Sequence, residues 1–443
     1  MFDHLQLSDW RERWAVGLAD QALALLAWPA RLWPARQRPP APRAILLLRL
    51  ERIGDLLMTR DAICAVRLLA PGARIDLVVG SWNEPVARLL PDVNGVEVLD
   101  ARWLARDREG DGMSALMRRA WAWRGRRYDL AINFEGDVRS NILLWLSGAS
   151  RRAGFDMAGG GPLLTERVTY NPREHVAVNA MTLVERALGG GQPSAKPVQR
   201  RPAGSSRLLL PAEARARAAE LLGLQSVARS SFENHRTIGT VPSPAVRAES
   251  AESRTAAGPG GGGQRPLVGI HAGGGREIKQ WEPARFAEVA SALVRSHHAR
   301  IVLTGSAGDR PLVDRVRALL PPDVQPIDLA GRLDLVSLAA VLERLSVLII
   351  GDTGPMHLAA AVGTRMVALF GPSAPERWGP LTASARILRI DLPCSPCNRI
   401  RRPPERCVGH VPDCLAGITV ACVTEAAGDM LDAIDAREDG DAR

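Results

Sequence analysis

The stretch from residue 346 to residue 357, Ser-Val-Leu-Ile-Ile-Gly-Asp-Thr-Gly-Pro-Met-His, decides the fold of the second half of the chain. Its apolar beginning predicts a buried strand. Pro355 suits the first turn of a following helix, where its missing N–H costs nothing. Thr353 and Gly354 leave that helix N-terminus open, and its unpaired N–H groups and dipole favour an anion. The segment therefore predicts a strand, a turn and a helix, with an anion site at the carboxyl end of the strand.

The same alternation of short apolar runs and amphipathic stretches continues on both sides of this segment. Strands that alternate with helices imply parallel sheets built from βαβ units. The pattern lapses over residues 226–264, which are rich in Ser, Arg, Ala and Gly and predict a disordered insertion. We therefore expect two α/β halves joined by an irregular middle. The predicted strands are residues 44–50, 75–79, 96–99 and 128–134 in the first half and 267–271, 301–304, 346–350 and 366–370 in the second, with helices at 56–69 and 140–146.

The composition agrees with a soluble two-domain protein that binds an anion. At 443 residues the chain exceeds what one hydrophobic core usually serves, and 46% apolar with 24% charged residues excludes wholesale disorder. The net charge of +9 is supplied mostly by Arg, which favours a nucleotide, phosphorylated lipid or nucleic acid as partner, although a GC-rich genome also enriches Arg. The basic residues are dispersed without a recognition motif, so we expect no nucleic-acid binding.

The N-terminal segment, residues 10–38, combines an apolar run with tryptophan and arginine. The run at residues 14–28 is shorter than the roughly 20 residues of a membrane-spanning helix. Indoles beside an apolar run, followed by Arg residues, are typical of a helix that lies in the membrane–water interface. The alternative is an ordinary amphipathic helix packed on its own domain. The residues that carry the pattern are Trp10, Trp14, Trp28, Trp33, Arg31, Arg36, Arg38 and Arg43.

Asp55 is the candidate catalytic residue of the first half. It follows the first predicted strand in the turn Leu-Glu-Arg-Ile-Gly-Asp, residues 50–55, at an edge where ligands of parallel sheets bind. An Asp at a helix start is also a routine N-cap, which is the alternative. The turn has a single Gly and lacks the G-x-G-x-x-G fingerprint, which argues against a dehydrogenase.

A second candidate anion site follows the strand that ends at His271. Gly273, Gly274 and Gly275 leave backbone N–H groups accessible, and Lys279 adds positive charge, so the loop predicts a phosphate cradle. A plain flexible loop is the alternative. Together with the helix start at Thr353, Gly354 and His357, it makes two anion sites in one half. That pairing indicates a diphosphate held between strand ends.

These motifs resemble glycosyltransferase family 9, the heptosyltransferases of lipopolysaccharide core assembly. The likeness covers roughly residues 43–200 and 265–430. The matching blocks are Arg52-Ile53-Gly54-Asp55, Lys279-x-Trp281, residues 352–360 (Asp-Thr-Gly-Pro-Met-His-Leu-Ala-Ala), Phe370-Gly371-Pro372, Arg139-Ser140 and Gly154-Phe155.

The resemblance implies a GT-B architecture, with two Rossmann-like domains whose parallel sheets face each other across a cleft. We expect an N-terminal extension (1–42), an acceptor domain (43–210), the insertion (225–264), a donor domain (265–425) and a C-terminal tail (426–443). The implied reaction is inverting and needs no metal or other cofactor: heptose or a related sugar moves from a nucleotide-diphosphate sugar, typically ADP-heptose, to a lipopolysaccharide-core or similar glycan. The expected location is cytoplasmic, peripheral on the inner membrane. A non-catalytic nucleotide-sugar-binding or membrane-tethered assembly protein of the same fold is the alternative.

By the same resemblance, Asp55 is the general base that deprotonates the acceptor hydroxyl. Lys279 and the helix start at Thr353, Gly354 and His357 would neutralise the departing diphosphate. Asp309 would bind the nucleotide ribose, and Asp352 would orient the donor sugar or its loop. The candidates for acceptor phosphates, each equally interpretable as a solvated surface charge, are Arg60, Arg139, Arg151 and Arg152. Residues 133–137, Asn-Phe-Glu-Gly-Asp, depart from the family pattern on the acceptor side.

A cluster of thiols lies near the C-terminus. Cys394, Cys397, Cys407, His410 and Cys414 have spacings that a structural tetrahedral Zn site uses. A disulfide or free thiols in a loop are the alternatives. We interpret Cys64 and Cys422 as buried core residues.

Overall fold

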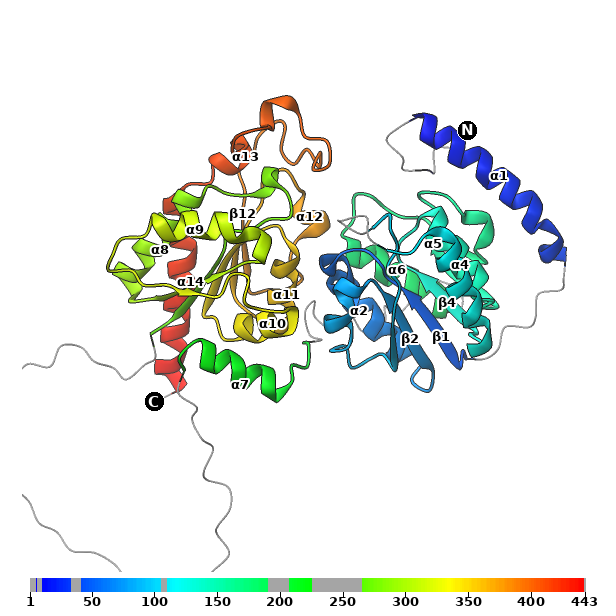
Figure 1. Ribbon diagram of the computed structural model, residues 1–443, viewed down its shortest axis with the longest axis horizontal. Helices are drawn as coiled ribbons and strands as arrows, with labels where there is room; N and C mark the ends of the chain where they lie inside the picture. The colour runs from blue at the N-terminus through cyan, green and yellow to red at the C-terminus, as the bar shows by residue number, and fades with distance from the viewer. Residues whose placement is uncertain are drawn as a thin grey trace, which may run out of the picture.

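The computed structural model describes residue 5 and residues 10–32, 41–104, 110–189, 207–224 and 265–441. Two α/β lobes lie side by side, with α2 (Ile53–Leu69) of the first lobe facing α10 (Leu335–Glu343) and α11 (Gly354–Val362) of the second (Figure 1). We call them the N lobe and the C lobe. The prediction of two α/β halves with parallel sheets is confirmed. The predicted disordered insertion lies outside the described residues.

The N lobe is built on six parallel strands in the order β3-β2-β1-β4-β5-β6. Residues 45–48 of the central strand are fully buried, because helices cover both faces of a parallel sheet. The strands are β1 (Ala44–Leu48), β2 (Arg74–Val79), β3 (Gly95–Val98), β4 (Leu130–Asn133), β5 (Arg151–Phe155) and β6 (Glu166–Val168). The other helices of this lobe are α3 (Glu84–Ala87), α4 (Met113–Ala122), α5 (Val138–Leu146) and α6 (Val176–Leu188).

The C lobe repeats this topology, with the strand order β12-β11-β10-β7-β8-β9. Its strands are β7 (Leu267–His271), β8 (Arg300–Thr304), β9 (Ile327–Asp328), β10 (Val347–Gly351), β11 (Met366–Leu369) and β12 (Ala385–Leu388). Its other helices are α7 (Ala212–Leu221), α8 (Pro283–His297), α9 (Arg310–Ala318), α12 (Pro375–Trp378), α13 (Asp413–Ala416) and α14 (Val420–Asp441). The boundary expected at residue 425 falls inside α14, whose Ala427 and Leu431 are buried.

Both sheets have the Rossmann strand order: the second and third strands are added on one side of the first strand, and the fourth to sixth strands are added on its other side. This switch point lies between β1 and β4 in the N lobe and between β7 and β10 in the C lobe. Loops that leave these strands diverge and open a crevice at the carboxyl edge. Asp55 follows β1 and Asp352 follows β10, so the fold places both predicted residues at switch points.

Helix α1 (Trp10–Leu32) lies along the outer side of the N lobe (Figure 1). Asp20 is buried and accepts a hydrogen bond of 2.6 Å from the backbone N–H of Gly160. Trp10 and Trp14 are 65% and 49% exposed on the part of the helix turned to solvent. Within the described residues, no helix is long and apolar enough to cross a membrane. One side of the helix therefore packs on its own lobe, as the second alternative predicted. Another side exposes indoles, as a helix in the membrane–water interface would.

Candidate active site

Two adjoining cavities open where the lobes meet. The C-lobe cavity, of about 610 Å³, is lined by Gly274, Asp309, Thr353 and His357 among others. The N-lobe cavity, of about 800 Å³, is lined chiefly by N-lobe residues, among them Glu51, which follows β1, and Glu135, which follows β4. Six residues line both cavities and form their junction: Arg52, Asp55, Gly275, Lys279, Trp378 and Ile400. The two residues predicted to be catalytic, Asp55 and Lys279, are thus both at the junction.

Glycines let the helix starts of the two lobes touch. A Cβ on Gly354, the first residue of α11, would lie 2.4 Å from Cγ2 of Ile53 in α2. A Cβ on Gly54 would lie 2.9 Å from Cδ2 of His357. A second bridge is His175, whose Nδ1 accepts from the N–H of Ala177, so that Nε2 donates to the carbonyl of Gly379, 3.0 Å away in the C lobe. These contacts hold Asp55 beside the amino end of α11.

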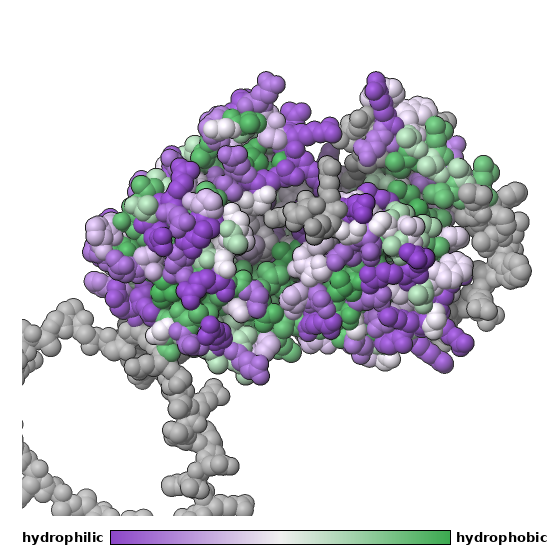
Figure 2. All heavy atoms as spheres, viewed as in Figure 1, coloured by the Kyte–Doolittle hydropathy of each residue, from purple (hydrophilic) through white to green (hydrophobic). Residues whose placement is uncertain are grey.

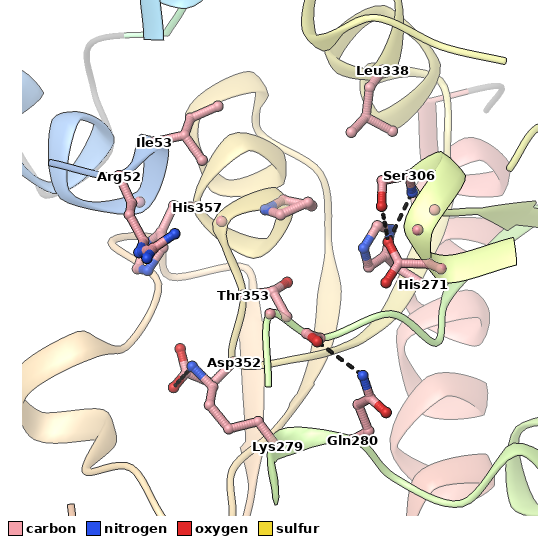
Figure 3. A pocket seen from close by; sticks show the side chains of 18 of the residues that line it. Arg52, Ile53, His271, Lys279, Gln280, Ser306, Leu338, Asp352, Thr353 and His357 are labelled. Carbon is pink, nitrogen blue, oxygen red and sulfur yellow. Dashed lines mark hydrogen bonds and ion pairs between the residues drawn. The ribbon is translucent and has the colours of Figure 1, made fainter. Parts of the chain in front are cut away.

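The amino end of α11 has polar groups available to a ligand. Thr353 is the N-cap residue, yet its side chain makes no capping hydrogen bond. Its Oγ1 is buried and has no hydrogen-bond partner among the described residues. An open helix start combines unpaired N–H groups with the positive end of the helix dipole. The side chains of Thr353 and His357 lie beside this end of the cavity, where the sequence predicts an anion site (Figure 3).

Lys279 is held by a buried carboxylate. Its Nζ lies 2.7 Å from Oδ2 of Asp352, and the same oxygen accepts a hydrogen bond from Ser373 (Figure 3 shows the lysine and aspartate). Two residues further on, Trp281 is buried in the core of the C lobe, where its indole donates to the carbonyl of Ile418. Asp352 is therefore engaged with Lys279, as a residue that positions the cation.

The glycines in the loop after β7 have different roles. A Cβ on Gly273 would lie 2.4 Å from Cγ of Asp309, so this glycine serves the close approach of that carboxylate and does not line the cavity. Gly274 and Gly275 do line it. Ser306 donates to Asp309 through its N–H, at 2.8 Å, and through its hydroxyl, at 2.6 Å, so Oδ2 is engaged while the residue still lines the cavity.

The histidines of the C-lobe cavity are neutral at pH 7. Burial lowers the pKa of His357 to about 4 although Asp352 and Asp55 lie nearby. Burial likewise lowers the pKa of His271 to about 4, and its Nδ1 lies 3.0 Å from the hydroxyl of Thr304. A neutral His357 would contribute a hydrogen bond and no charge to the diphosphate site predicted at this helix start, and the cations that line the cavity are Lys279 and Arg52.

Asp55 keeps a reachable carboxylate while it also bonds the N-cap backbone of its helix. The N-cap residue of α2 is Arg52, so the alternative that Asp55 is the N-cap is wrong. Asp55 is the third residue of the helix, and its Oδ2 accepts from the N–H of Arg52 at 3.3 Å. Its Oδ1 lies 3.4 Å from Nη2 of Arg49, and the side chain remains 25% exposed. The hydrogen bond at the helix start and a place at the cavity junction are thus both present in one residue.

Sequence reasoning missed a buried charge cluster beneath Asp55. Arg49 is buried at the end of β1, and its Nη1 donates to the carbonyl of Phe134 at 2.9 Å. The same guanidinium lies 3.5 Å from Glu51 and 3.8 Å from Glu135. Burial and the Glu51 charge raise the pKa of Glu135 well above its usual value. Glu135 lies in the departing segment 133–137, which was the available signal.

The four arginines predicted for the acceptor do not line the N-lobe cavity. Arg60 is buried in α2 beside Asp61. Arg151 and Arg152 are at the amino end of β5, away from the edge where ligands bind, and contact Glu166 and the carbonyl of Leu163 respectively. Arg139 stacks over Trp103, which does line the cavity. The arginines that line it are instead Arg49, Arg52, Arg276, Arg377 and Arg401.

The thiol cluster forms no metal site among the described residues. No group of three or more His, Cys, Asp or Glu side chains there is arranged to hold a metal ion, and the cysteines are free. Burial, together with Cys397 and Cys407, raises the pKa of Cys414 to about 11. The zinc prediction at Cys394, Cys397, Cys407, His410 and Cys414 is therefore unsupported, and Cys422, expected in the core, is exposed.

Comparisons with known proteins agree with this geometry. A sequence model described as Glycosyltransferase family 9 (heptosyltransferase) matches residues 117–407. The lipooligosaccharide heptosyltransferase 2 of Haemophilus influenzae is 32% identical over 131 residues, which are 29% of this chain and 38% of that protein. The lipooligosaccharide heptosyltransferase 2 of Haemophilus ducreyi is 24% identical over 354 residues, 78% of this chain and 88% of that protein.

Solved structures show the same fold. The structure of Escherichia coli ADP-heptose lipopolysaccharide heptosyltransferase II covers 88% of this chain and 99% of its own, with a TM-score of 0.65 and 20% identity. A family 9 glycosyl transferase from Veillonella parvula covers 90% and 99%, with a TM-score of 0.66 and 22% identity. The predicted GT-B-type architecture is thereby confirmed.

Proposed function

The chain belongs to glycosyltransferase family 9, and from that premise we propose that it is an inverting, metal-independent transferase. It moves heptose from ADP-heptose to a lipopolysaccharide-core glycan. The observation that carries the proposal is that Asp55 and Lys279 both line the junction of the two cavities. One cavity then takes the activated sugar and the other takes the alcohol that attacks it.

The donor lies in the C-lobe cavity. Its diphosphate meets the open N–H groups of α11, the cation of Lys279 and the hydroxyl of Thr353, which has no hydrogen-bond partner in the described part of the chain. Asp309, which lines the same cavity, faces the ribose. A solved relative, the Escherichia coli heptosyltransferase WaaC, is described with ADP-2-deoxy-2-fluoro heptose, which supports the choice of nucleotide.

Transfer is a single displacement at the anomeric carbon. Asp55 takes the proton of the acceptor hydroxyl as that oxygen forms its bond to the anomeric carbon. The bond from this carbon to the β-phosphate oxygen breaks on the opposite face, its electron pair stays on ADP, and the configuration inverts. Negative charge develops on the leaving diphosphate, where the fixed α11 dipole and Lys279 stabilise it. Positioned donors of this kind do the work that a metal ion would otherwise do.

The acceptor is lipid-linked, so the enzyme works at the cytoplasmic face of the inner membrane, with α1 as the docking element. Trp10, Trp14, Leu18 and Leu25 of α1 are exposed, and in Figure 2 hydrophobic side chains gather over this helix. Asp20 of α1 binds Gly160, three residues after Met157, which lines the N-lobe cavity. Docking through α1 would therefore bring the acceptor cavity to the membrane.

The test is direct. The purified chain is incubated with ADP-heptose and heptose-deficient lipopolysaccharide, and the products are ADP and a glycan heavier by one heptose. Release of ADP without any gain in glycan mass would refute transfer and leave a hydrolase or a binding protein.

A further inference from the structure

The C lobe contributes a cationic wall to the N-lobe cavity. Arg276, Arg377 and Arg401 line it, and none of them forms an ion pair with an acidic side chain within the described residues. The carboxylates that line the same cavity, Glu51, Asp55 and Glu135, all belong to the N lobe and gather around Arg49. The cavity thus has an excess of positive charge on the side opposite the catalytic base.

Arg377 is the most constrained of these cations. Its guanidinium carbon lies over the Trp378 ring, 4.3 Å from the ring centre, so the cation rests on an indole at the cavity junction. Its Nε is buried and has no hydrogen-bond partner among the described residues. A buried donor without an acceptor costs free energy unless a ligand supplies one. A planar guanidinium pairs best with a carboxylate or a phosphate.

The opposite wall is aromatic. Trp103, Phe155 and Tyr170 line the N-lobe cavity, and Phe155 meets Tyr170 edge to face with ring centres 5.2 Å apart. Trp103 is held by the Arg139 guanidinium 4.6 Å from its ring centre, and its Nε1 is a second buried donor without a partner in the described part of the chain. Aromatic faces with a few fixed polar groups are what a sugar-binding pocket offers.

We propose that Arg276, Arg377 and Arg401 form an anion subsite for a phosphate or carboxylate carried by the acceptor sugar. The ring of that sugar lies against Trp103 and Tyr170, and the anion reaches across to the C lobe. The acceptor then touches both lobes, which directs its free hydroxyl to Asp55 at the junction. This inference rests on the proposed function in taking the N-lobe cavity as the acceptor side.

The experiment measures binding without turnover. Saturating ADP first fills the diphosphate site, and calorimetry at constant ionic strength then follows glucose 6-phosphate, gluconate and neutral glucose. We expect saturable binding of the sugar phosphate, the sugar carboxylate or both, and none of glucose; the stronger of the two identifies the anion. R377M and R401M should each weaken that binding at least about tenfold, because each variant removes a charged hydrogen-bond donor from the anion.

The control is R402M, which removes an exposed arginine beside Arg401 that does not line the cavity. It should bind the anion as the wild type does, and all variants should bind ADP unchanged. Equal affinity for glucose and the anions, retained binding in R377M and R401M, or an equal loss in R402M would each overturn the subsite. Because no sugar is transferred in this measurement, a failed transfer assay would leave its result unaffected.

Discussion

The Nζ atom of Lys279 lies 2.7 Å from Oδ2 of Asp352, an ion pair that joins the loop after β7 to the end of β10. These strands are neighbours across the switch point of the C-lobe sheet. The pair therefore fixes a cation where the loops diverge and a ligand has room. Because Ser373 donates to the same carboxylate oxygen, Asp352 cannot turn away without losing two partners.

Lys279→Ala should weaken ADP binding about tenfold or more and leave adenosine binding within about twofold. The reason is that the lysine charge faces the diphosphate, and a charged hydrogen bond contributes roughly 1.5–3 kcal/mol. Asp352→Asn should show a smaller loss of the same kind, since it frees the lysine without removing its charge. Calorimetric titration of both ligands checks this. Equal losses for ADP and adenosine would show that Lys279 does not face the phosphates.

Asp55→Asn should lower kcat on the order of 10²–10⁴, the usual effect of losing a general base, while ADP binding survives. The amide cannot accept the hydroxyl proton, but it retains the size of the carboxyl group. Asp61→Asn, in the same helix and away from both cavities, is the matched control and should keep its turnover. Wild-type kcat in Asp55→Asn would remove this residue from the chemistry.

Gly354→Ala should lower turnover by separating the two helix starts, because its Cβ would meet Cγ2 of Ile53 at 2.4 Å. The double variant Gly354→Ala/Ile53→Ala removes the clashing atom and should recover part of the lost activity. Gly112→Ala, where a Cβ meets nothing within 4 Å, should have no effect. If the double variant is no better than the single one, contact between the lobes at this point does not limit the reaction.

Much of the fold and the C-lobe site could be predicted because each depended on local signals. Apolar runs such as Ile-Leu-Leu-Leu at 45–48 identify central strands, and Pro355 after Gly354 marks a helix start. β5 could not be predicted in this way, because its sequence, Arg-Arg-Ala-Gly-Phe at 151–155, begins with two charged residues and is not an apolar run. The same two arginines suggested acceptor ligands, but as the first residues of a strand they lie at the edge of the sheet away from the ligand.

The charge cluster below Asp55 could not be predicted from local signals. Arg49 and Glu135 are 86 positions apart and meet only because β1 and β4 are neighbours in the sheet. Sequence alone predicted both strands but not their order. Likewise, Arg377 and Arg401 reach the N-lobe cavity only through the packing of one lobe on the other.

Stability should fall as the pH decreases from about 7 towards 4, and His357 should contribute to that fall. Burial lowers the pKa of His357 from 6.5 to about 4. Between these pH values the imidazole is protonated in the unfolded chain and neutral in the folded chain. The stability this neutral histidine retains at pH 7 is thus lost on acidification, by up to about 3 kcal/mol. Glu135, whose pKa is raised, acts in the opposite direction, so single variants must be compared.

The measurement is the free energy of unfolding in urea at pH 7.5, 6 and 5, for the wild type and His357→Gln. The variant should show the smaller decrease between pH 7.5 and pH 5, because glutamine does not titrate. The groups that face His357 are Asp352, Asp55, His175 and Lys279, and they are unchanged in this comparison. Parallel curves for the two proteins would show that His357 is not the titrating group.

The exposed indoles of α1 should govern membrane binding. Trp10 and Trp14 are four residues apart and therefore on one side of the helix, whereas Asp20 fixes another side to the N lobe. Trp10→Ser/Trp14→Ser should abolish most co-sedimentation with vesicles that contain anionic phosphatidylglycerol, while turnover in detergent stays near the wild-type value. Trp121→Ser, which removes an equally exposed indole from α4, is the matched control and should sediment normally. If the control loses as much binding as the double variant, the vesicles respond to general surface hydrophobicity, and α1 is not the docking element.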